Sequence, residues 1–437
     1  MKRFCFVQLM LTMVLLFIFN SGFCLEDCFN YECMRQDLSD KYGWDELKIW
    51  EEKGKDSRTL EKRWPTWQLQ LTTEEEKKKY GTTGLELMQK QYSASHSEGY
   101  SMRMFVYIDV VHEGGVRKIA GWRCDLNPMA PKEYLDPNFA EDKKDGEDWF
   151  MIQHWVHPAD TRGTGILVKS PNNKAQENDT WVWFPSLRKE RRLTPAGGGD
   201  ALVGSDLTFA EAYLWRITDE KFQIIGETKF KSFLPVDYYE GLTLLDKYGP
   251  NTKQFGEFIK GTVSQSRDCW VVRAIPVKGG YADWYSTRIA IMDKEWGVAY
   301  SWDIFDSKQR MMKCYTTYWN RHSDYNGKPH LSPFAFGEAI NFENWGFTVI
   351  TALQSNWGIP VPEVWGSLME LKKSVPSIRI PYMEVLAPQQ LAPLEQLYDP
   401  QTIEARKKIF PEGRITTFAN PTEIVGWDKW VSSGESE

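Results

Sequence analysis

The segment 181–209, WVWFPSLRKERRLTPAGGGDALVGSDLTF, contains residue types that can bind anions. Aromatic residues come first, basic residues follow (among them Arg188, Arg191 and Arg192), and a glycine triplet comes next. Glycines beside basic side chains are typical of a phosphate loop, of a nucleic-acid patch or of an ordinary hairpin. Which of these chemistries applies depends on the neighbouring residues and on the elements that position them.

A phosphate loop and a nucleic-acid patch are both disfavoured by the surrounding residues. The phosphate loop needs Gly-x-x-x-x-Gly-Lys-Ser/Thr, because its lysine reaches the terminal phosphates. Here DALVGSD follows Gly199, so an acid stands where that pattern needs a base. The chain has 60 acidic and 53 basic residues and a net charge of −7. Since an acidic protein is a poor general binder of nucleic acid, we expect no nucleic-acid partner.

Motifs of common hydrolases and metal sites do not occur in the sequence. It has no Gly-x-Ser-x-Gly elbow and no His-Glu-x-x-His motif. The tightest histidine pair, His154 and His157, would point to opposite faces of a strand and could not share a metal ion. We therefore expect no metal and no other cofactor, and we predict that the protein is not an enzyme.

The first 24 residues have the order of a secretory signal. Lys2 and Arg3 precede an apolar run, and small or polar residues follow it. Gly22 and Cys24 would occupy the −3 and −1 positions of a cleavage site, so we predict export to the periplasm. The alternative is an outer-membrane lipoprotein anchored through Cys24, which the large Phe23 before it disfavours.

Five cysteines follow residue 24, so at most two disulfides can form among them. Cys28 and Cys33 are close enough to pair in an oxidising compartment. Cys269 and Cys314 lie in expected strands and would pair if those strands were neighbours. The alternative is that these two and Cys124 are small, buried apolar residues.

Residues 101–353 contain about a dozen segments typical of half-buried strands. The first, SMRMFVYIDVV, places Met102, Met104 and Val106 at alternating positions on one face. Turn signals such as Asn326-Gly327 separate many of the segments. Because few helices lie between them, the pattern predicts a mainly β fold with a large curved antiparallel sheet rather than βαβ units.

Helices are expected at both ends of this β region and once inside it. Residues 73–92 predict a helix that two glycines can split, with capping-box spacing at Thr83 and Glu86. Residues 207–216 predict a helix inside the β region.

The start of this inner helix has two interpretations. Ser205 or Asp206 can cap it directly. If it begins two residues later, Thr208 and Glu211 form a capping box instead.

These patterns divide the chain into four parts. Residues 1–24 are the expected signal peptide, and residues 25–99 an N-terminal helical and irregular extension. Residues 100–354 are the β domain. Residues 355–437 are a proline-rich C-terminal tail that wraps the domain and contains one short helix at 402–408.

The segment 180–208 resembles a motif of the outer-membrane lipoprotein-sorting protein family, the LolA/LolB-like periplasmic carriers, in the form found in their larger relatives. The matching residues are Trp181-Val182-Trp183-Phe184-Pro185, Arg188-Lys189-Glu190-Arg191-Arg192, and Gly204-Ser205-Asp206 after the glycine turn. A second stretch, YSTRIAIMD, places Tyr285, Arg288 and Asp293 where the family pattern has Tyr, Arg and Asp. The resemblance covers roughly residues 100–320.

The resemblance implies a half-open antiparallel barrel around an apolar cavity, with a few helices as a lid. The small carriers bind acylated lipoproteins, but the larger branch has no settled ligand. We therefore expect a non-enzymatic periplasmic carrier or binder of a lipid or another hydrophobic small molecule, and we expect a monomer. An inner-membrane transporter or an outer-membrane acceptor would be its protein partner.

The expected ligand contacts combine apolar and basic residues: Met102, Met104, Val106, Trp181, Trp183, Arg188, Arg191 and Arg192. The arginines have two interpretations. They either pair with Asp200 and Asp206 and fix the hairpin, or they surround the cavity mouth and hold a lipid phosphate or carboxylate.

Two other functions are compatible with the sequence. The β domain can have a filled core and serve as a structural or docking module of the outer membrane or of an export system. An enzyme acting on polysaccharide or lipid would need two carboxylates facing each other across a groove.

Overall fold

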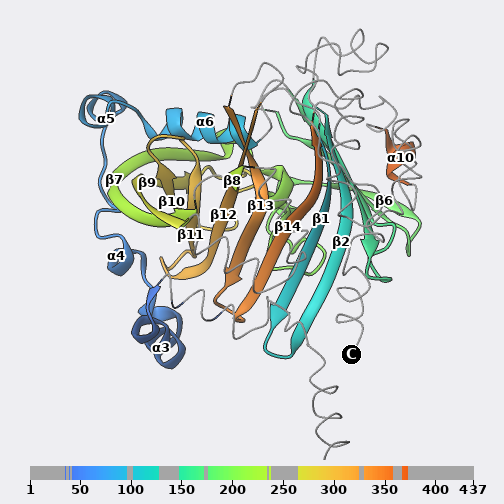
Figure 1. Ribbon diagram of the computed structural model, residues 1–437, viewed down its shortest axis with the longest axis horizontal. Coiled ribbons are helices and arrows are strands. Elements are labelled where there is room, and N and C mark those ends of the chain that lie inside the picture. The colour runs from blue at the N-terminus through green and yellow to red at the C-terminus, as the bar shows by residue number, and fades with distance from the viewer. Residues whose placement is uncertain are drawn as a thin grey trace, which may run out of the picture.

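The computed structural model describes residues 42–95, 102–126, 147–171, 176–233, 236–237, 264–323, 329–357 and 367–372, with the single positions 35 and 39. These residues form one large β-sheet with short helices around it (Figure 1). The strands are β1 (Met102–His112), β2 (Gly115–Leu126), β3 (Glu147–His157), β4 (Gly165–Pro171), β5 (Asp179–Phe184), β6 (Lys189–Leu193), β7 (Glu220–Phe233), β8 (Val236–Asp237), β9 (Ser264–Pro276), β10 (Thr287–Asp293), β11 (Ala299–Phe305), β12 (Met311–Ser323), β13 (Pro329–Asn341) and β14 (Gly346–Trp357). None of the described helices is long and apolar enough to cross a membrane.

The sheet has 14 strands, and its order is β6-β5-β4-β3-β2-β1-β14-β13-β12-β11-β10-β9-β7. The short β8 pairs in parallel with β12 beside this path, and the pairs along the path are antiparallel. Among the described residues β6 and β7 each have one neighbouring strand, so the sheet is open. The predicted mainly β fold with a large antiparallel sheet is confirmed, but the sheet is not the closed barrel that the term β-barrel would imply.

The strand order determines the path of the chain between β6 and β7. These strands follow each other in the sequence but lie at opposite edges of the sheet. The connection, residues 194–219, therefore has to cross a face of the sheet. Its central part packs on that face through Leu202, Leu207 and Ala210. We call residues 202–214 the lid, and the face that they cover the lid face.

Side chains along each strand alternate between two cores, as the pleat requires. On the lid face, Val106, Ile108 and Ile350 form a core with the lid. On the opposite face, Val111 and Val349 belong to a second core, which the N-terminal segment completes. That segment comprises α3 (Trp44–Lys53), the 3-10 turn η1 (Gly54–Ser57) and α4 (Leu60–Arg63), so we call this the N-terminal face.

The N-terminal segment is attached to the sheet by a buried carboxylate. Asp303 of β11 accepts hydrogen bonds from Arg63 Nε at 2.9 Å, Trp64 Nε1 at 3.0 Å and Tyr42 Oη at 3.2 Å. Burial alone would lower the pKa of Arg63, but the Asp303 carboxylate more than offsets this and the pKa is raised. Ionic and aromatic contacts therefore hold this segment against the sheet.

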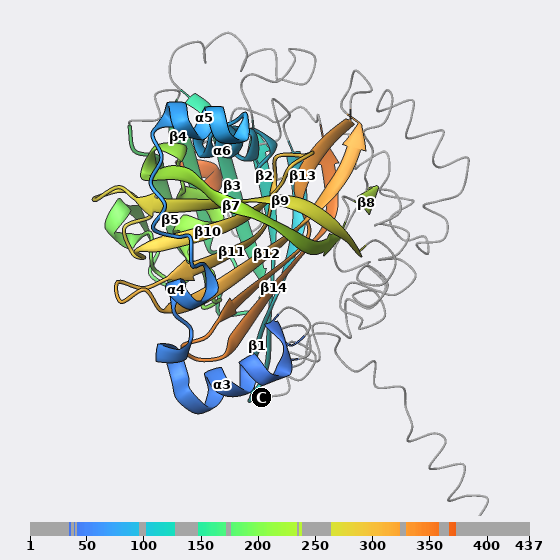
Figure 2. The ribbon, with the colours of Figure 1, turned by 90° about the vertical axis from the view of Figure 1, so that its left-hand side faces the viewer.

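Two further helices precede the sheet in the sequence, α5 (Thr73–Tyr80) and α6 (Gly84–Ser95). They confirm the predicted split of residues 73–92. Glu86 Oε2 accepts from the Thr83 amide at 3.2 Å, and Thr83 Oγ1 accepts from the Glu86 amide at 3.2 Å, as the capping box requires. Leu87 and Met88 are buried on the lid face among side chains of β7, β9, β10 and β11. The sheet beneath is strongly twisted: β7 and β9 run across Figure 2, whereas β12 to β14 rise steeply.

The structure adds β13, which the alternation pattern did not reveal. This strand contains Pro329, Pro333 and Gly337, which favour turns in a sequence. Pro333 lies opposite Trp319, next to a register shift, and such a bulge tolerates a residue that has no amide hydrogen. The expected helix at 207–216 is also shorter, a π-helical turn at Ala210–Leu214.

Two cysteine expectations can be compared with the structure. Cys269 lies on β9 and Cys314 on β12, with β10 and β11 between them, so the proposed disulfide is wrong. Both are buried thiols, as the alternative held, and burial raises the pKa of Cys269 to about 12. Cys28, Cys33 and the side chain of Cys124 lie outside the described residues. So do residues 1–24 and the expected helix at 402–408.

Candidate functional site

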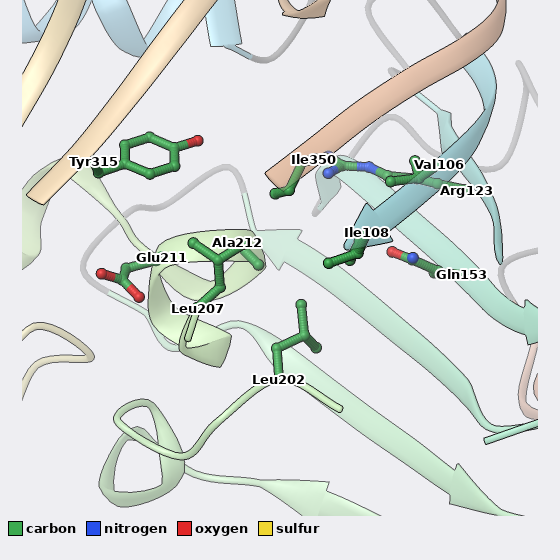
Figure 3. Close-up of a pocket in the computed structure, with 10 residues that line it drawn as sticks. All are labelled: Val106, Ile108, Arg123, Gln153, Leu202, Leu207, Glu211, Ala212, Tyr315 and Ile350. Atoms are coloured by element: carbon green, nitrogen blue, oxygen red, sulfur yellow. The ribbon is translucent and has the colours of Figure 1, made fainter. Parts of the chain in front are cut away.

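A cleft separates the lid from the sheet (Figure 3). Its sheet side comes from β1, β2, β3, β12 and β14. Six apolar and four polar residues line it: Val106, Ile108, Leu202, Leu207, Ala212 and Ile350, with Arg123, Gln153, Glu211 and Tyr315. The empty space is about 430 Å³ including the part open to solvent, and its enclosed part has room for about two water molecules. The lid therefore fills most of the cleft in this structure.

Polar groups lie in two places around the apolar walls. Figure 3 shows Glu211 and Tyr315 on the side of the lid helix, and Arg123 and Gln153 across the cleft. Burial raises the pKa of the Tyr315 hydroxyl above its ordinary value. The cleft is thus amphipathic, with apolar walls and polar groups at both sides.

The lid begins with a tight turn whose backbone is strained. The Leu202 amide donates to the Leu207 carbonyl at 2.7 Å, and the Ser205 amide donates to the Leu202 carbonyl at 2.8 Å. Inside this turn Val203 has φ 46° and Gly204 has φ 80°. Left-handed backbone suits glycine but is unfavourable for a β-branched residue. Arg117 Nη1 donates to the Val203 carbonyl at 2.9 Å and so helps to hold the strained peptide.

Asp206 attaches this turn to the sheet. Its amide donates to Thr348 Oγ1 at 2.8 Å, and its carboxylate accepts from the Thr348 hydroxyl at 3.2 Å. The side-chain amides of Asn341 and Asn344 donate to the same carboxylate at 3.3 and 3.4 Å. The expectation that Ser205 or Asp206 caps the helix is therefore wrong, because Asp206 binds β14 and the β13–β14 turn while Ser205 Oγ accepts from the Leu207 amide within the turn.

The helical turn of the lid begins at the alternative position. Glu211 Oε2 accepts from the Thr208 amide at 2.6 Å, and Thr208 Oγ1 accepts from the Glu211 amide at 3.1 Å. The same carboxylate oxygen accepts from Lys313 Nζ of β12 at 2.8 Å. Glu211 therefore caps the lid helix and also fastens it to the sheet.

A second ionic cluster lies beside the cleft and contains two residues of the sequence motif. Glu220 accepts from Tyr285 Oη at 2.5 Å, from Trp215 Nε1 at 2.6 Å and from the guanidinium of Arg288. The Arg288 guanidinium lies 4.0 Å from the ring centroid of Trp302. Burial raises the pKa of Tyr285 well above its ordinary value. Tyr285 and Arg288 thus hold the start of β7, where the chain leaves the lid.

The third motif residue, Asp293, organises the turn between β10 and β11. Its carboxylate accepts from Arg267 Nε at 2.8 Å, from Tyr300 Oη at 2.9 Å and from the amides of Glu295 and Trp296 at 2.8 and 2.7 Å. Burial opposes ionisation, but these hydrogen bonds outweigh it, so the pKa of Asp293 is lowered. Asp293 lies at the end of its strand and orders that turn.

The structure brings only part of the expected ligand set to the cleft. Val106 lines it. Met102 and Met104 lie on the same strand, but their side chains are outside the described part. Trp181 and Trp183 alternate with Val182, which packs under the lid, so their side chains lie on the N-terminal face.

The arginines of the basic run lie at the open edge of the sheet. Arg192 Nε donates to Asp179 Oδ1 at 2.9 Å, and both side chains are about half exposed. Arg188 is exposed in the β5–β6 turn with φ 48°, and Arg191 is exposed on β6. The expected Asp206 partner is wrong, since Asp206 binds Thr348 and the two asparagines. Arg192 does bind an acidic residue of its own chain, but that residue is Asp179.

Sequence reasoning missed the basic residues that lie at the cleft. Arg123 lines it, and Lys313 is 4% exposed beside it. No local motif marks either residue. The one signal was alternation: Lys313 and Tyr315 lie two apart on a strand, so both point to the same face.

Comparisons with known proteins place the chain in a family. In solved structures it resembles a domain assigned to an outer membrane lipoprotein-sorting protein from Vibrio parahaemolyticus, with 16% identity and a TM-score of 0.47 over 66% of this chain and 98% of that one. A DUF1329 family protein from Desulfovibrio piger has 17% identity and a TM-score of 0.47 over 66% and 97%. A LolA superfamily protein from Nitrosomonas europaea has 12% identity and a TM-score of 0.40 over 63% and 93%.

These neighbours bear the family names that the two sequence motifs predicted, but likenesses at this level assign no function to the chain. No curated protein matches the chain. The family model described as "Protein of unknown function (DUF1329)" matches residues 81–344, which include the sheet from β1 to β13, the lid and all three motif residues of the second stretch. Because this match spans more than half of the sequence, the chain belongs to the DUF1329 family.

Proposed function

We propose that this protein is a non-enzymatic carrier or binder of a hydrophobic ligand, a lipid or an acyl chain, and that it works in the periplasm as a monomer. The cleft between lid and sheet carries the proposal. Mostly apolar walls with a few placed polar groups are typical of small-molecule sites. Val106 contributes to one wall, and Met102 and Met104 stay candidate contacts from the same strand.

The ligand enters by replacing the lid. Leu202 and Leu207 are 1% and 2% exposed, and burial of each stabilises the closed form by about 2 kcal/mol. An acyl chain of roughly 12 methylenes gains ~10 kcal/mol on burial, part of which is lost to ordering. Burial of such a chain therefore exceeds the burial of the two leucines, and the difference offsets the loss of the lid's polar attachments. Delivery then needs an acceptor that offers similar apolar surroundings, such as a transporter of the inner membrane or an acceptor of the outer membrane, and it needs no bond to be made or broken.

The test uses protein purified without detergent. We expect native mass spectrometry and solvent extraction to detect a bound lipid, and a fluorescent fatty acid to bind the delipidated protein. Ile350→Trp puts a large side chain from β14 of the sheet into the cleft, where it stays when the lid opens, and should weaken binding at least about tenfold. Leu187→Trp, at an exposed position in the β5–β6 turn, is the matched control and should bind as the wild type does. A protein that arrives empty and binds no fatty acid would refute the proposal.

One observation favours a second function, a structural or docking module without a ligand. The closed cleft has enclosed room for only about two water molecules. If the lid never leaves the sheet, the lid face is a filled core. A wild type that binds no ligand, with an Ile350→Trp variant that loses stability because its core is overpacked, would support this module.

A further inference from the structure

Lys313 is a buried cation on the lid face, and its carboxylate partner belongs to the lid. The lysine is 4% exposed, and its ammonium lies 2.8 Å from Glu211 Oε2. Lys313 is part of β12 and stays with the sheet when the lid moves, whereas Glu211 moves with the lid. Opening therefore separates the two charges and leaves the ammonium on a mostly apolar face. A charge covered by an acyl chain without a partner is strongly unfavourable, so a form in which a ligand replaces the lid favours another anion at Lys313.

The surroundings of Lys313 suit such an anion. Its ammonium lies 5.1 Å from the ring centroid of Trp284. The buried indole Nε1 of Trp284 finds no acceptor among the described residues, so it is a donor available to a second group at this position. Tyr315, two residues after Lys313 on the same face, lines the apolar cleft. An ammonium and an indole donor thus lie at the Glu211 side of the apolar walls.

We infer that Lys313 and Trp284 form the headgroup site for an anionic amphiphile, a single acyl chain with a carboxylate or phosphate, and that Glu211 occupies this site while the lid is closed. This inference rests on the proposed function and specifies its ligand. The acyl chain lies along the apolar walls where Leu202 and Leu207 pack in the closed form. The headgroup replaces Glu211 at Lys313 and accepts from the Trp284 indole. A neutral amphiphile provides the chain but leaves the ammonium without a counter-charge, so the site selects for anions.

Glu211→Gln tests whether the lid carboxylate keeps this site closed. Glutamine keeps the capping hydrogen bonds of the lid helix but removes the competing charge. We expect this variant to bind both dodecanoate and glycerol monododecanoate about tenfold more tightly than the wild type does, because either chain has to displace the lid, and to keep the wild type's preference for dodecanoate. Trp fluorescence and calorimetry measure both affinities. Glu190→Gln is the matched control, because Glu190 binds Lys372 at 3.0 Å at the other face of the sheet, and it should leave both affinities unchanged.

Lys313→Met removes the ammonium itself, whereas Glu211→Gln removes the carboxylate that covers it. We expect dodecanoate to bind this variant about tenfold more weakly, near the affinity of the neutral ester. Urea unfolding checks that the variant is folded, and if it is not, the wild type's preference for dodecanoate over the neutral ester decides. Dodecanoate binding that is unchanged or weaker in Glu211→Gln overturns the inference.

Three outcomes distinguish a failure of the headgroup site from a failure of the proposed carrier function. If neither amphiphile binds the wild type, the proposed carrier function fails. If both bind equally well and Glu211→Gln changes neither, the carrier function stands and the headgroup site is wrong. If inorganic phosphate alone binds as tightly as a dodecyl phosphate and competes with it, the site takes a free anion, and the assignment to an amphiphile is overturned.

Discussion

Several buried charges in this protein are joined across long stretches of sequence. Glu220 binds Arg288, Glu211 binds Lys313, and Asp293 binds Arg267. The spacing of Tyr285, Arg288 and Asp293 was visible in the sequence, but their partners were not. Glu220 and Arg288 are 68 positions apart, and only the pairing of β7 with β9 and of β9 with β10 brings them together. The sequence motif therefore identified three residues that the fold uses, but it did not identify the residues that they bind.

The Asp293 turn allows a test at the level of one side chain. Asp293→Asn removes the charge that Arg267 binds, and we expect it to lower the free energy of unfolding at pH 7 by about 3 kcal/mol. Hydrogen bonds hold the pKa of Asp293 below that of an unfolded aspartate, which is about 4. The contribution is therefore complete above that value and is lost as the pH falls through the folded value. Urea unfolding of both proteins from pH 7 downward should show their difference shrinking below about pH 4.

Asp268→Asn is the control for this experiment. Asp268 also binds a base, Lys229 at 3.1 Å, but both side chains are about two-thirds exposed or more. Such exposed pairs contribute at most about 1 kcal/mol. A difference between wild type and Asp293→Asn that stays constant with pH would show that the carboxylate does not act through its charge.

At the level of elements, the lid differs most from its sequence prediction. Periodicity predicted a ten-residue helix at 207–216, and the structure has a strained turn followed by a π-helical turn at Ala210–Leu214. Helical periodicity identifies an apolar face, but Leu202 and Leu207 reach the sheet from a turn instead. The glycines were correctly assigned to a turn. The sequence could not show that this turn crosses the sheet, because that follows from the strand order.

The first turn of the lid can be tested through Gly204. Its φ of 80° disfavours any side chain, and a Cβ there would lie 2.5 Å from Arg117 Nη1. Gly204→Ala should therefore strain the backbone by about 1–2 kcal/mol and also displace Arg117 from the Val203 carbonyl. We expect a loss of roughly 3 kcal/mol in total in thermal or urea unfolding.

Gly279→Ala measures the backbone strain alone. Gly279 has φ 83°, and nothing lies within 4 Å of its added Cβ. We expect this variant to lose about 1–2 kcal/mol. Equal losses in the two variants would mean that Arg117 does not hold the lid turn.

The whole molecule combines a sheet whose central strands are buried on both faces with a lid that is attached at a few points. β10 and β11 lie inside the sheet and are buried on both faces, by the N-terminal segment and by α6. The lid is held by two Leu side chains, by Asp206 at Thr348 and by Glu211 at Lys313. Because the strand order alone sends the lid across the sheet, the lid can leave without breaking a strand pair. A stable sheet beneath a lid that can open is what the proposed carrier function requires.

Hydrogen exchange of the native protein tests whether the lid opens while the sheet stays intact. We expect amides of the lid to exchange through local opening, at least about tenfold faster than amides of β10 and β11, since a tenfold ratio corresponds to about 1.4 kcal/mol. Glu211→Gln should speed exchange in the lid and leave β10 and β11 unchanged, because it weakens one attachment of the lid and none of the sheet. Mass spectrometry of peptic fragments resolves these segments. Equal protection of the lid and the central strands would mean that the lid opens only when the whole protein unfolds, and a ligand would then have no route to the cleft.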